Sequence, residues 1–127
     1  MKKEIKEELD EFLKQIKETK YFQDIEFIII YGSVLTDYYL ERSDIDICIY
    51  IREEKTKLTE IWLDLLSNFP EKYDIQMFQL LPLYLQIEIL KGEIIYVKNE
   101  DFVYKVAYQT IDRWEDFYPL YKDYIES

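Results

Sequence analysis

The sequence predicts an α+β fold, in which helices alternate with the strands of a mixed β-sheet, pack against it and end with a C-terminal helix. Three observations predict this class. Segments with apolar residues at helical spacing alternate with short β-branched runs, in the order α-β-α-β-α-β-α-β-α. Apolar residues make up 49% of the 127 positions, which is enough for a globular core. Since the chain shows no linker, repeat or low-complexity tract, we expect one domain over residues 1–127.

The first predicted elements lead to a glycine-serine turn. Residues 3–19 carry apolar side chains at intervals of three and four, which predicts an amphipathic helix. The run IEFIIIYG, residues 25–32, is rich in isoleucine and stops at Gly32, so it predicts a buried strand. Ser33 is a favourable N-cap, and a short helix is expected over residues 33–40.

The remaining elements continue the alternation towards the C-terminus. Residues 101–117 carry an apolar stripe that is typical of a helix, and Pro119 is expected to break or restart that helix. The segments in between are predicted as strands at 44–50, 73–80 and 93–98 and as helices at 56–69 and 81–92.

The composition excludes several classes of function. A net charge of −11 argues against direct binding of nucleic acid through a broad basic surface. The absence of histidine excludes Ser-His-Asp catalysis and the usual zinc sites. No apolar run is long enough to span a membrane, and the N-terminus lacks the apolar core of a signal peptide. Cys48 is the single cysteine and cannot form an internal disulfide, so we expect a cytoplasmic protein.

Two aspartates alternate with isoleucines at the start of the strand predicted over residues 44–50. Alternate strand residues face opposite sides, so Asp44 and Asp46 share one face, and the isoleucines form the expected core face. Two adjacent carboxylates repel each other, and a divalent cation removes that penalty. Oxygen ligands without histidine or cysteine favour Mg²⁺ or Mn²⁺. The alternative is that Asp44 belongs to an ordinary turn and that Asp46 is solvated on an exposed face.

The glycine-serine pair lies between a predicted strand and a predicted helix. Gly32 has no Cβ, so a ligand can approach the backbone closely. Ser33 would lie at a helix N-terminus, where free N–H groups and the helix dipole favour a phosphate. Alone, the pair is equally typical of an ordinary turn that is capped by serine.

Together, Gly32, Ser33, Asp44 and Asp46 form the pattern G-S, ten residues, D-x-D. With the flanking segments FIIIYGS and SDIDICIY, the pattern resembles the nucleotidyltransferase superfamily of the DNA polymerase β type. It is more closely similar to the minimal nucleotidyltransferases, which are the MNT or MntA-type antitoxins of HEPN–MNT toxin–antitoxin systems. The resemblance covers most of the chain, because size, element order, an acidic residue on a third strand and a tyrosine-rich acidic C-terminal helix also agree.

The resemblance implies a polymerase β-like nucleotidyltransferase fold with two Mg²⁺ ions and ATP as the co-substrate. Asp44 and Asp46 would bind metal and act in catalysis. Asp74, which opens the next strand, is the candidate for a third catalytic and metal-binding carboxylate, although a simple turn residue is the alternative there. Gly32 and Ser33 would bind the nucleotide. The implied partner is a HEPN-family (HepT-like) RNase toxin, which forms a hetero-oligomer with the MNT protein and is silenced when AMP is transferred to its tyrosine.

The segment after the glycine-serine turn departs from the family pattern. Many members carry arginines there, as in GSRARG, whereas this chain has GSVLTDYY and no basic residue before Arg42. Arg42 is therefore the candidate cation for nucleotide binding, and Arg52, Lys55 and Lys57 are further candidates. The missing cations leave open a degenerate nucleotidyltransferase that neutralises the toxin by binding alone. Transfer to a small molecule is a third reading, which the short chain disfavours.

The predicted C-terminal helix interleaves aromatic and acidic residues. Thirteen tyrosines in the whole chain exceed what a core of this size needs, because each buried hydroxyl requires a hydrogen-bond partner. Tyrosine and tryptophan are favoured at protein interfaces. Some of these side chains are expected to pack on the sheet, and the rest predict a docking surface for another protein.

Overall fold

The computed structural model describes residues 2–37, 39 and 43–126, and its helices and strands follow the predicted order except between the first two strands. The helices are α1 (Lys3–Lys17), α2 (Lys55–Asn68), α3 (Leu83–Leu90) and α4 (Glu100–Glu126). The strands are β1 (Ile25–Tyr31), β2 (Ile45–Ile51), β3 (Tyr73–Met77) and β4 (Glu93–Val97). Among the residues described, no helix has the length and apolar character needed to cross a membrane.

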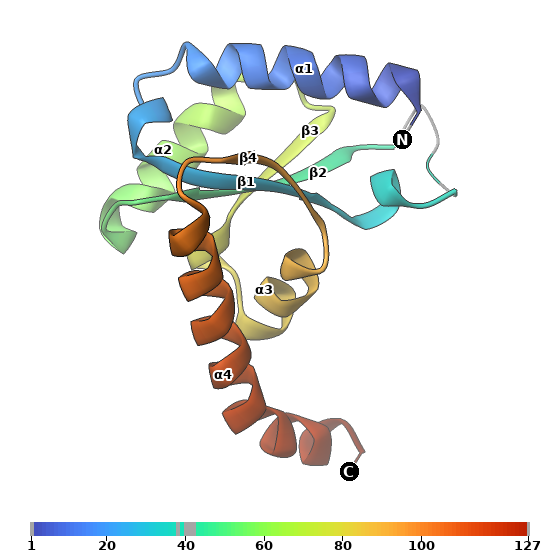
Figure 1. The fold of residues 1–127 in the computed structure, drawn as a ribbon, viewed down its shortest axis with the longest axis vertical. Coiled ribbons are helices and arrows are strands. Elements are labelled where there is room, and N and C mark those ends of the chain that lie inside the picture. The colour runs from blue at the N-terminus through green and yellow to red at the C-terminus, as the bar shows by residue number, and fades with distance from the viewer. Residues whose placement is uncertain (1, 38, 40–42, 127) are drawn as a thin grey trace.

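The four strands form one mixed sheet, as the sequence predicted, and their order in it is β3-β2-β1-β4. Strand β1 runs antiparallel to both β2 and β4, whereas β2 and β3 are parallel. A parallel pair requires a crossover connection, and α2 provides it. Figure 1 shows α1 and α2 on one side of the sheet and α3 and α4 on the other. The longest helix, α4, extends well beyond the sheet towards the C-terminus.

The face of the sheet towards α1 and α2 carries the larger core. Its centre is Phe12 of α1, which is fully buried and lies 5.2 Å from the ring centroids of both Phe69 and Tyr73. The strands contribute the isoleucines that the alternating pattern predicted, and these are completely or almost completely buried. They are Ile28 and Ile30 of β1, and Ile45, Ile47, Ile49 and Ile51 of β2.

The opposite face of the sheet is also packed, so the expectation of a single core face is wrong. Phe27 and Ile29 of β1 and Cys48 of β2 pack against residues of α3 and α4, among them Ile89 and Val106. Cys48 is 2% exposed, and this burial raises the pKa of its thiol above the ordinary value. The strand pattern distinguishes the two faces, but it does not show that later helices return to cover the second one.

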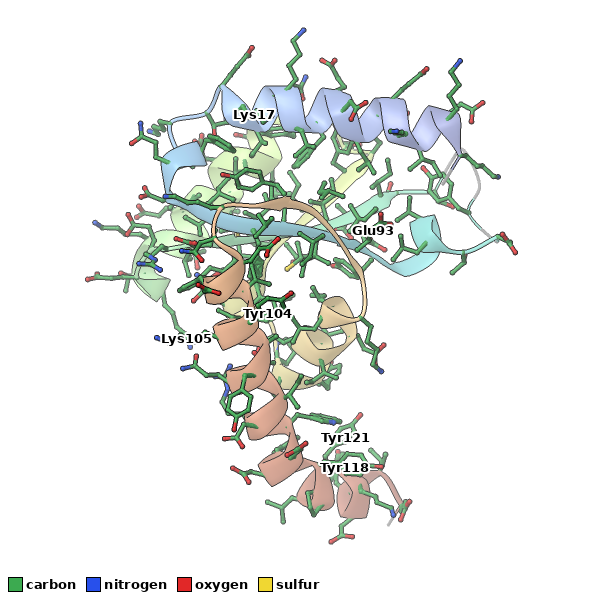
Figure 2. All side chains as sticks on the ribbon, viewed as in Figure 1. Lys17, Glu93, Tyr104, Lys105, Tyr118 and Tyr121 are labelled. Atoms are coloured by element: carbon green, nitrogen blue, oxygen red, sulfur yellow. The ribbon has the colours of Figure 1, made fainter. Side chains whose placement is uncertain are left out.

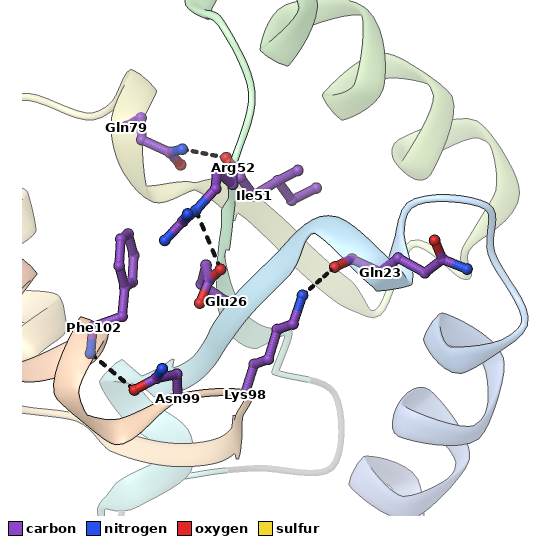
Figure 3. Close-up of polar contacts among 8 residues, drawn as sticks. All are labelled: Gln23, Glu26, Ile51, Arg52, Gln79, Lys98, Asn99 and Phe102. Atoms are coloured by element: carbon purple, nitrogen blue, oxygen red, sulfur yellow. Dashed lines mark hydrogen bonds and ion pairs between the residues drawn. The ribbon is translucent and has the colours of Figure 1, made fainter.

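Polar contacts stabilise the end of the sheet at which β2 ends (Figure 3). The carboxylate of Glu26, whose side chain is only 7% exposed, pairs with Nε of Arg52 at 3.3 Å. The guanidinium of Arg52 also lies 4.5 Å from the ring centroid of Phe102 in α4. Lys98 Nζ donates a hydrogen bond to the carbonyl of Gln23 at 2.6 Å. These contacts join β1, β2 and the start of α4.

Two local predictions differ from the structure. In place of a helix over residues 33–40, there is a single 3-10 turn, Gly32–Leu35, and residues 38 and 40 lie outside those described. Pro119 does not end the last helix, because α4 continues through it to Glu126. A proline inside a helix removes one backbone hydrogen bond and favours a bend. Figure 1 shows such a change of direction in the last turns of α4.

The pair between Glu26 and Arg52 leads to a stability prediction. Substitution Arg52→Leu leaves a nearly buried carboxylate without its partner, so the free energy of unfolding should fall by about 1–3 kcal/mol. Urea unfolding followed by circular dichroism measures the change. Combining Arg52→Leu with Glu26→Gln should restore part of the loss.

The matched control is Lys72→Leu. It breaks the pair between Lys72 and Glu8, whose side chains are 47% and 39% exposed, so the cost should stay below about 1 kcal/mol. Equal losses for the two single variants would show that the burial of Glu26 does not determine the effect.

Candidate active site

The turn after β1 depends on the glycine at its start. Gly32 has a φ of +78°, in the left-handed region that favours glycine. A Cβ built on Gly32 would lie 2.5 Å from Oδ2 of Asp46, which is closer than real Cβ contacts allow. Gly32 is therefore required twice, for its backbone conformation and for the space that the carboxylate of Asp46 occupies. The structure thus places the glycine-serine turn directly against the predicted catalytic strand.

Asp46 and Asp74 lie side by side in the parallel strand pair. They are direct partners in the register of β2 and β3, and both are half-buried. Burial, the charge of Asp74, a hydrogen bond with Asp74 and the charge of Asp44 together raise the pKa of Asp46 to about 6. The choice of Asp74 as the neighbouring carboxylate agrees with this placement, and its catalytic role stays a prediction.

Asp44 is exposed and lies two residues before Asp46, directly ahead of β2. It shares with Asp74 the wall of a cavity of about 360 Å³. Within residues 2–37, 39 and 43–126, no three Asp, Glu, Cys or His side chains gather in a metal-binding arrangement. The structure therefore brings Asp46 and Asp74 together, with Asp44 at the rim, and the role of the three carboxylates as metal ligands stays a prediction.

The paired carboxylates suit a divalent cation chemically. The donors are oxygen atoms only, which is the ligand type that Mg²⁺ prefers. Burial and the neighbouring carboxylates raise the pKa of Asp46, and a bound cation would oppose this shift by favouring the ionised form. Asp46 and Asp74, with Asp44 at the rim, are the residues that would hold such an ion.

Ser33 lies within the 3-10 turn and is half-buried. Its carbonyl accepts hydrogen bonds from the backbone N–H of Thr36 at 3.0 Å and from the Thr36 hydroxyl at 2.8 Å. Because the turn has only four residues, the helix dipole that the sequence suggested at Ser33 is absent. A role of Gly32 and Ser33 in phosphate binding stays a prediction that rests on backbone access and on the serine hydroxyl.

Of the predicted cations that the structure describes, Arg52 and Lys55 do not lie at this site. Arg42 lies outside the described residues. Arg52 follows the opposite end of β2 and is engaged with Glu26, so its proposed contribution to nucleotide binding is not supported. Lys55 opens α2 beyond that same end, where it lines a cavity of about 610 Å³ together with Arg113.

The sequence analysis missed two neighbours of the carboxylates. Gln76 donates a hydrogen bond from Nε2 to Oδ1 of Asp74 at 3.1 Å. Tyr31 is the partner of Asp46 across β1 and β2, and burial, followed by the charges of Cys48, Asp46 and Asp74, raises its pKa. The contact of Gln76 could have been predicted from the sequence, because strand alternation places Gln76 on the same face of β3 as Asp74.

Comparison with known proteins places this site in context. Residues 11–101 match the family described as "Polymerase beta, Nucleotidyltransferase". A Methanocaldococcus jannaschii protein named "Putative protein adenylyltransferase" is 35% identical over 89 residues, which cover 70% of this chain and 69% of that protein.

Solved structures of toxin–antitoxin complexes contain chains with a similar fold. One is a tri-AMPylated Shewanella oneidensis HEPN toxin in complex with its MNT antitoxin, with a TM-score of 0.67, 16% identity and 92% coverage of both chains. Another is a toxin–antitoxin structure with AMP-PNP, with a TM-score of 0.72 and 17% identity, covering 92% of this chain and 94% of that one. At such low identity these matches show the fold alone.

The raised pKa of Asp46 predicts how stability depends on pH without metal. The folded-state pKa of about 6 lies above the unfolded value of about 3.9, so this group favours folding most below pH 4. That contribution is lost as the pH rises through 6. Asp46→Asn should therefore raise the melting temperature at pH 7.5 in EDTA, and the gap to the original chain should shrink towards pH 4.

Scanning calorimetry from pH 4 to pH 8 measures this gap. Added Mg²⁺ should stabilise the original chain and leave Asp46→Asn nearly unchanged, because only the ionised carboxylate attracts the cation. Asp10→Asn, at an exposed position of α1, is the control and should show neither effect. A lower melting temperature for Asp46→Asn at pH 7.5 would show that the carboxylate is structural.

Proposed function

Because the chain belongs to the polymerase β nucleotidyltransferase family, we propose that it is a protein adenylyltransferase that acts as an antitoxin. It transfers AMP from Mg-ATP to a tyrosine of a HEPN-family, HepT-like RNase toxin, with which it forms a hetero-oligomer in the cytoplasm. The single observation that carries this proposal is the placement of Asp46 and Asp74 side by side against the Gly32 turn. The name of the 35% identical relative and the complexes with similar folds support the choice of acceptor.

The proposed reaction is a displacement at the α-phosphorus of ATP. The tyrosine oxygen forms a bond to that phosphorus, the bond to the bridging oxygen breaks, and pyrophosphate leaves. Two Mg²⁺ ions, held by Asp44, Asp46 and Asp74, would supply the positive charge that the phosphates and the leaving pyrophosphate need. Asp74 is the candidate to accept the hydroxyl proton, and a tyrosine with a pKa near 10 is easier to deprotonate than a serine. Gly32 and Ser33 would bind the phosphates.

The transfer explains silencing by simple electrostatics. An AMP group on a tyrosine of an RNase active site places a negative phosphate where the phosphate of RNA must bind. Like charges repel, and the bulky nucleotide also fills space. The acidity of the antitoxin, with a net charge of −11, suits association with a basic RNA-binding protein before transfer.

A second candidate is neutralisation by binding alone. It is favoured by the turn Gly32–Leu35, which carries no cation, and by Arg52, which is paired elsewhere. A triphosphate carries close to four negative charges, so few neighbouring cations imply weak nucleotide binding. The two candidates differ in whether the partner becomes covalently modified.

Mass spectrometry of the partner separates these candidates. The chain is incubated with ATP, Mg²⁺ and the HEPN protein that is proposed as its partner. The HEPN protein should gain the mass of one or more AMP units on a tyrosine, and its RNase activity should fall in parallel. Replacing Asp46 by asparagine should reduce the rate of transfer at least about 100-fold, since it removes charge that acts in the reaction.

Asp37→Asn is the matched control, because Asp37 is an exposed acid two residues beyond the same turn. It should retain transfer. If the HEPN protein stays unmodified but is inhibited equally by the original chain and by Asp46→Asn, the enzymatic proposal fails and binding alone accounts for the inhibition.

A further inference from the structure

The C-terminal half of α4 extends away from the body of the domain and has no buried residues. The buried residues of this helix, Val103, Val106 and Thr110, all lie in its first half. None of the residues from 111 to 126 is buried. Figure 2 shows Tyr118 and Tyr121 on the last turns of α4, far from the sheet, whereas Tyr104 lies close to it. An isolated helical segment of this length gains little stability in water without packing.

This segment forms an apolar groove with the start of α3. Tyr84 and Tyr121 stack with an interplanar angle of 8° and a centroid distance of 6.3 Å. The C-terminal aromatic groove has a volume of about 510 Å³. It is lined by Pro82, Leu83, Tyr84, Phe117, Leu120, Tyr121 and Tyr124.

Large apolar side chains are exposed along the groove. Leu120 is 69% exposed, and Tyr84 and Phe117 are more than 40% exposed. A contiguous exposed apolar surface in a small protein marks a site of association. A groove between two helices fits a further helix, since apolar residues at spacings of three and four can enter it.

The charge around the groove selects the partner. Residues 114–126 contain four carboxylates, those of Glu115, Asp116, Asp123 and Glu126, and one lysine. Within the part of the chain that the structure describes, none of these four forms an ion pair. A second copy of the chain would bring the same acidic segment and a further net charge of −11, so self-association is opposed by repulsion. A basic partner is attracted.

We propose that the C-terminal aromatic groove binds a positively charged amphipathic helix of the protein that accepts the AMP group. This inference rests on the proposed function, because it takes the occupant to be the acceptor. The groove belongs to α3 and α4, which cover the side of the sheet towards which Asp46 and Asp74 point (Figure 1). A protein held in the groove is therefore held on the side where the reaction takes place.

The test measures affinity separately from chemistry. Calorimetric titration of the full chain with the HEPN protein proposed as its partner, without ATP, gives Kd for the original chain and for Leu120→Asp. Leu120→Asp should weaken binding about tenfold or more, because it places a charge in an apolar contact. Leu63→Asp is the matched control: Leu63 is 55% exposed on α2, on the other side of the sheet, and its substitution should leave Kd unchanged.

A second set of variants tests whether the acidic residues near the groove attract the partner. Asp116→Lys with Asp123→Lys should slow association and reduce the dependence of Kd on salt. Glu7→Lys with Asp10→Lys makes the same change in net charge at exposed positions of α1, and should have a much smaller effect. Equal effects of the two double variants would show attraction by net charge alone and would overturn the assignment to the groove.

Three further outcomes are decisive. Equal affinity of the original chain and Leu120→Asp, or no binding of the HEPN protein at all, overturns the inference. A dimer of the chain alone that Leu120→Asp dissociates overturns it in favour of a second copy. AMP transfer measured in the same samples keeps the proposals apart. Binding through the groove without transfer contradicts only the enzymatic function, and transfer with unaltered binding by Leu120→Asp contradicts only the groove.

Discussion

Two carboxylates held side by side on neighbouring parallel strands are the constraint on which this structure depends. Burial, together with repulsion between Asp46 and Asp74, raises the pKa of Asp46 to about 6. A free strand end would move apart to relieve that repulsion. Strands β2 and β3 are held in register because Ile47 and Ile75 are fully buried on one face and Cys48 on the other. A Cβ on Gly32 would lie 2.5 Å from Oδ2 of Asp46, so the glycine leaves room for that carboxylate beside the turn.

The sequence predicted the positions of most helices and strands, but it did not predict what packs against each face of the sheet. Apolar spacing located the helices and strands, and the alternation of Asp46 with isoleucines identified the face of the site. It did not show that α3 and α4 return to bury Cys48, since a strand pattern carries no information about what covers each face. Likewise, Ser33 was a plausible N-cap by residue type, but the chain forms only one 3-10 turn there. Pro119 was expected to end a helix that in fact continues.

The described cations that the sequence suggested for nucleotide binding lie away from the carboxylates, unlike the arginines that follow the glycine-serine turn in many family members. Arg52 lies six residues beyond Asp46, which is about 20 Å along an extended strand, and it neutralises the buried Glu26. Lys55 and Arg113 also gather beyond that end of the sheet. These cations stabilise or line the opposite end of the domain. If the chain binds ATP as proposed, a triphosphate near Gly32 would depend for neutralisation on metal ions at Asp46 and Asp74, on Arg42, which lies outside the described residues, and on any cation that the partner contributes.

A site that binds its nucleotide weakly can still react quickly if its acceptor is held in place. Positioning two reactants converts a bimolecular step into one within a complex, with a gain that exceeds most single contacts. This domain has the two parts that such a division requires. The first half of α4, through Val103 and Val106, is fixed to the sheet that carries Asp46, and its second half exposes apolar and acidic side chains. In the proposed complex, one continuous helix would link partner binding to the geometry of the reaction, and the partner's affinity would compensate for the cations that the turn lacks.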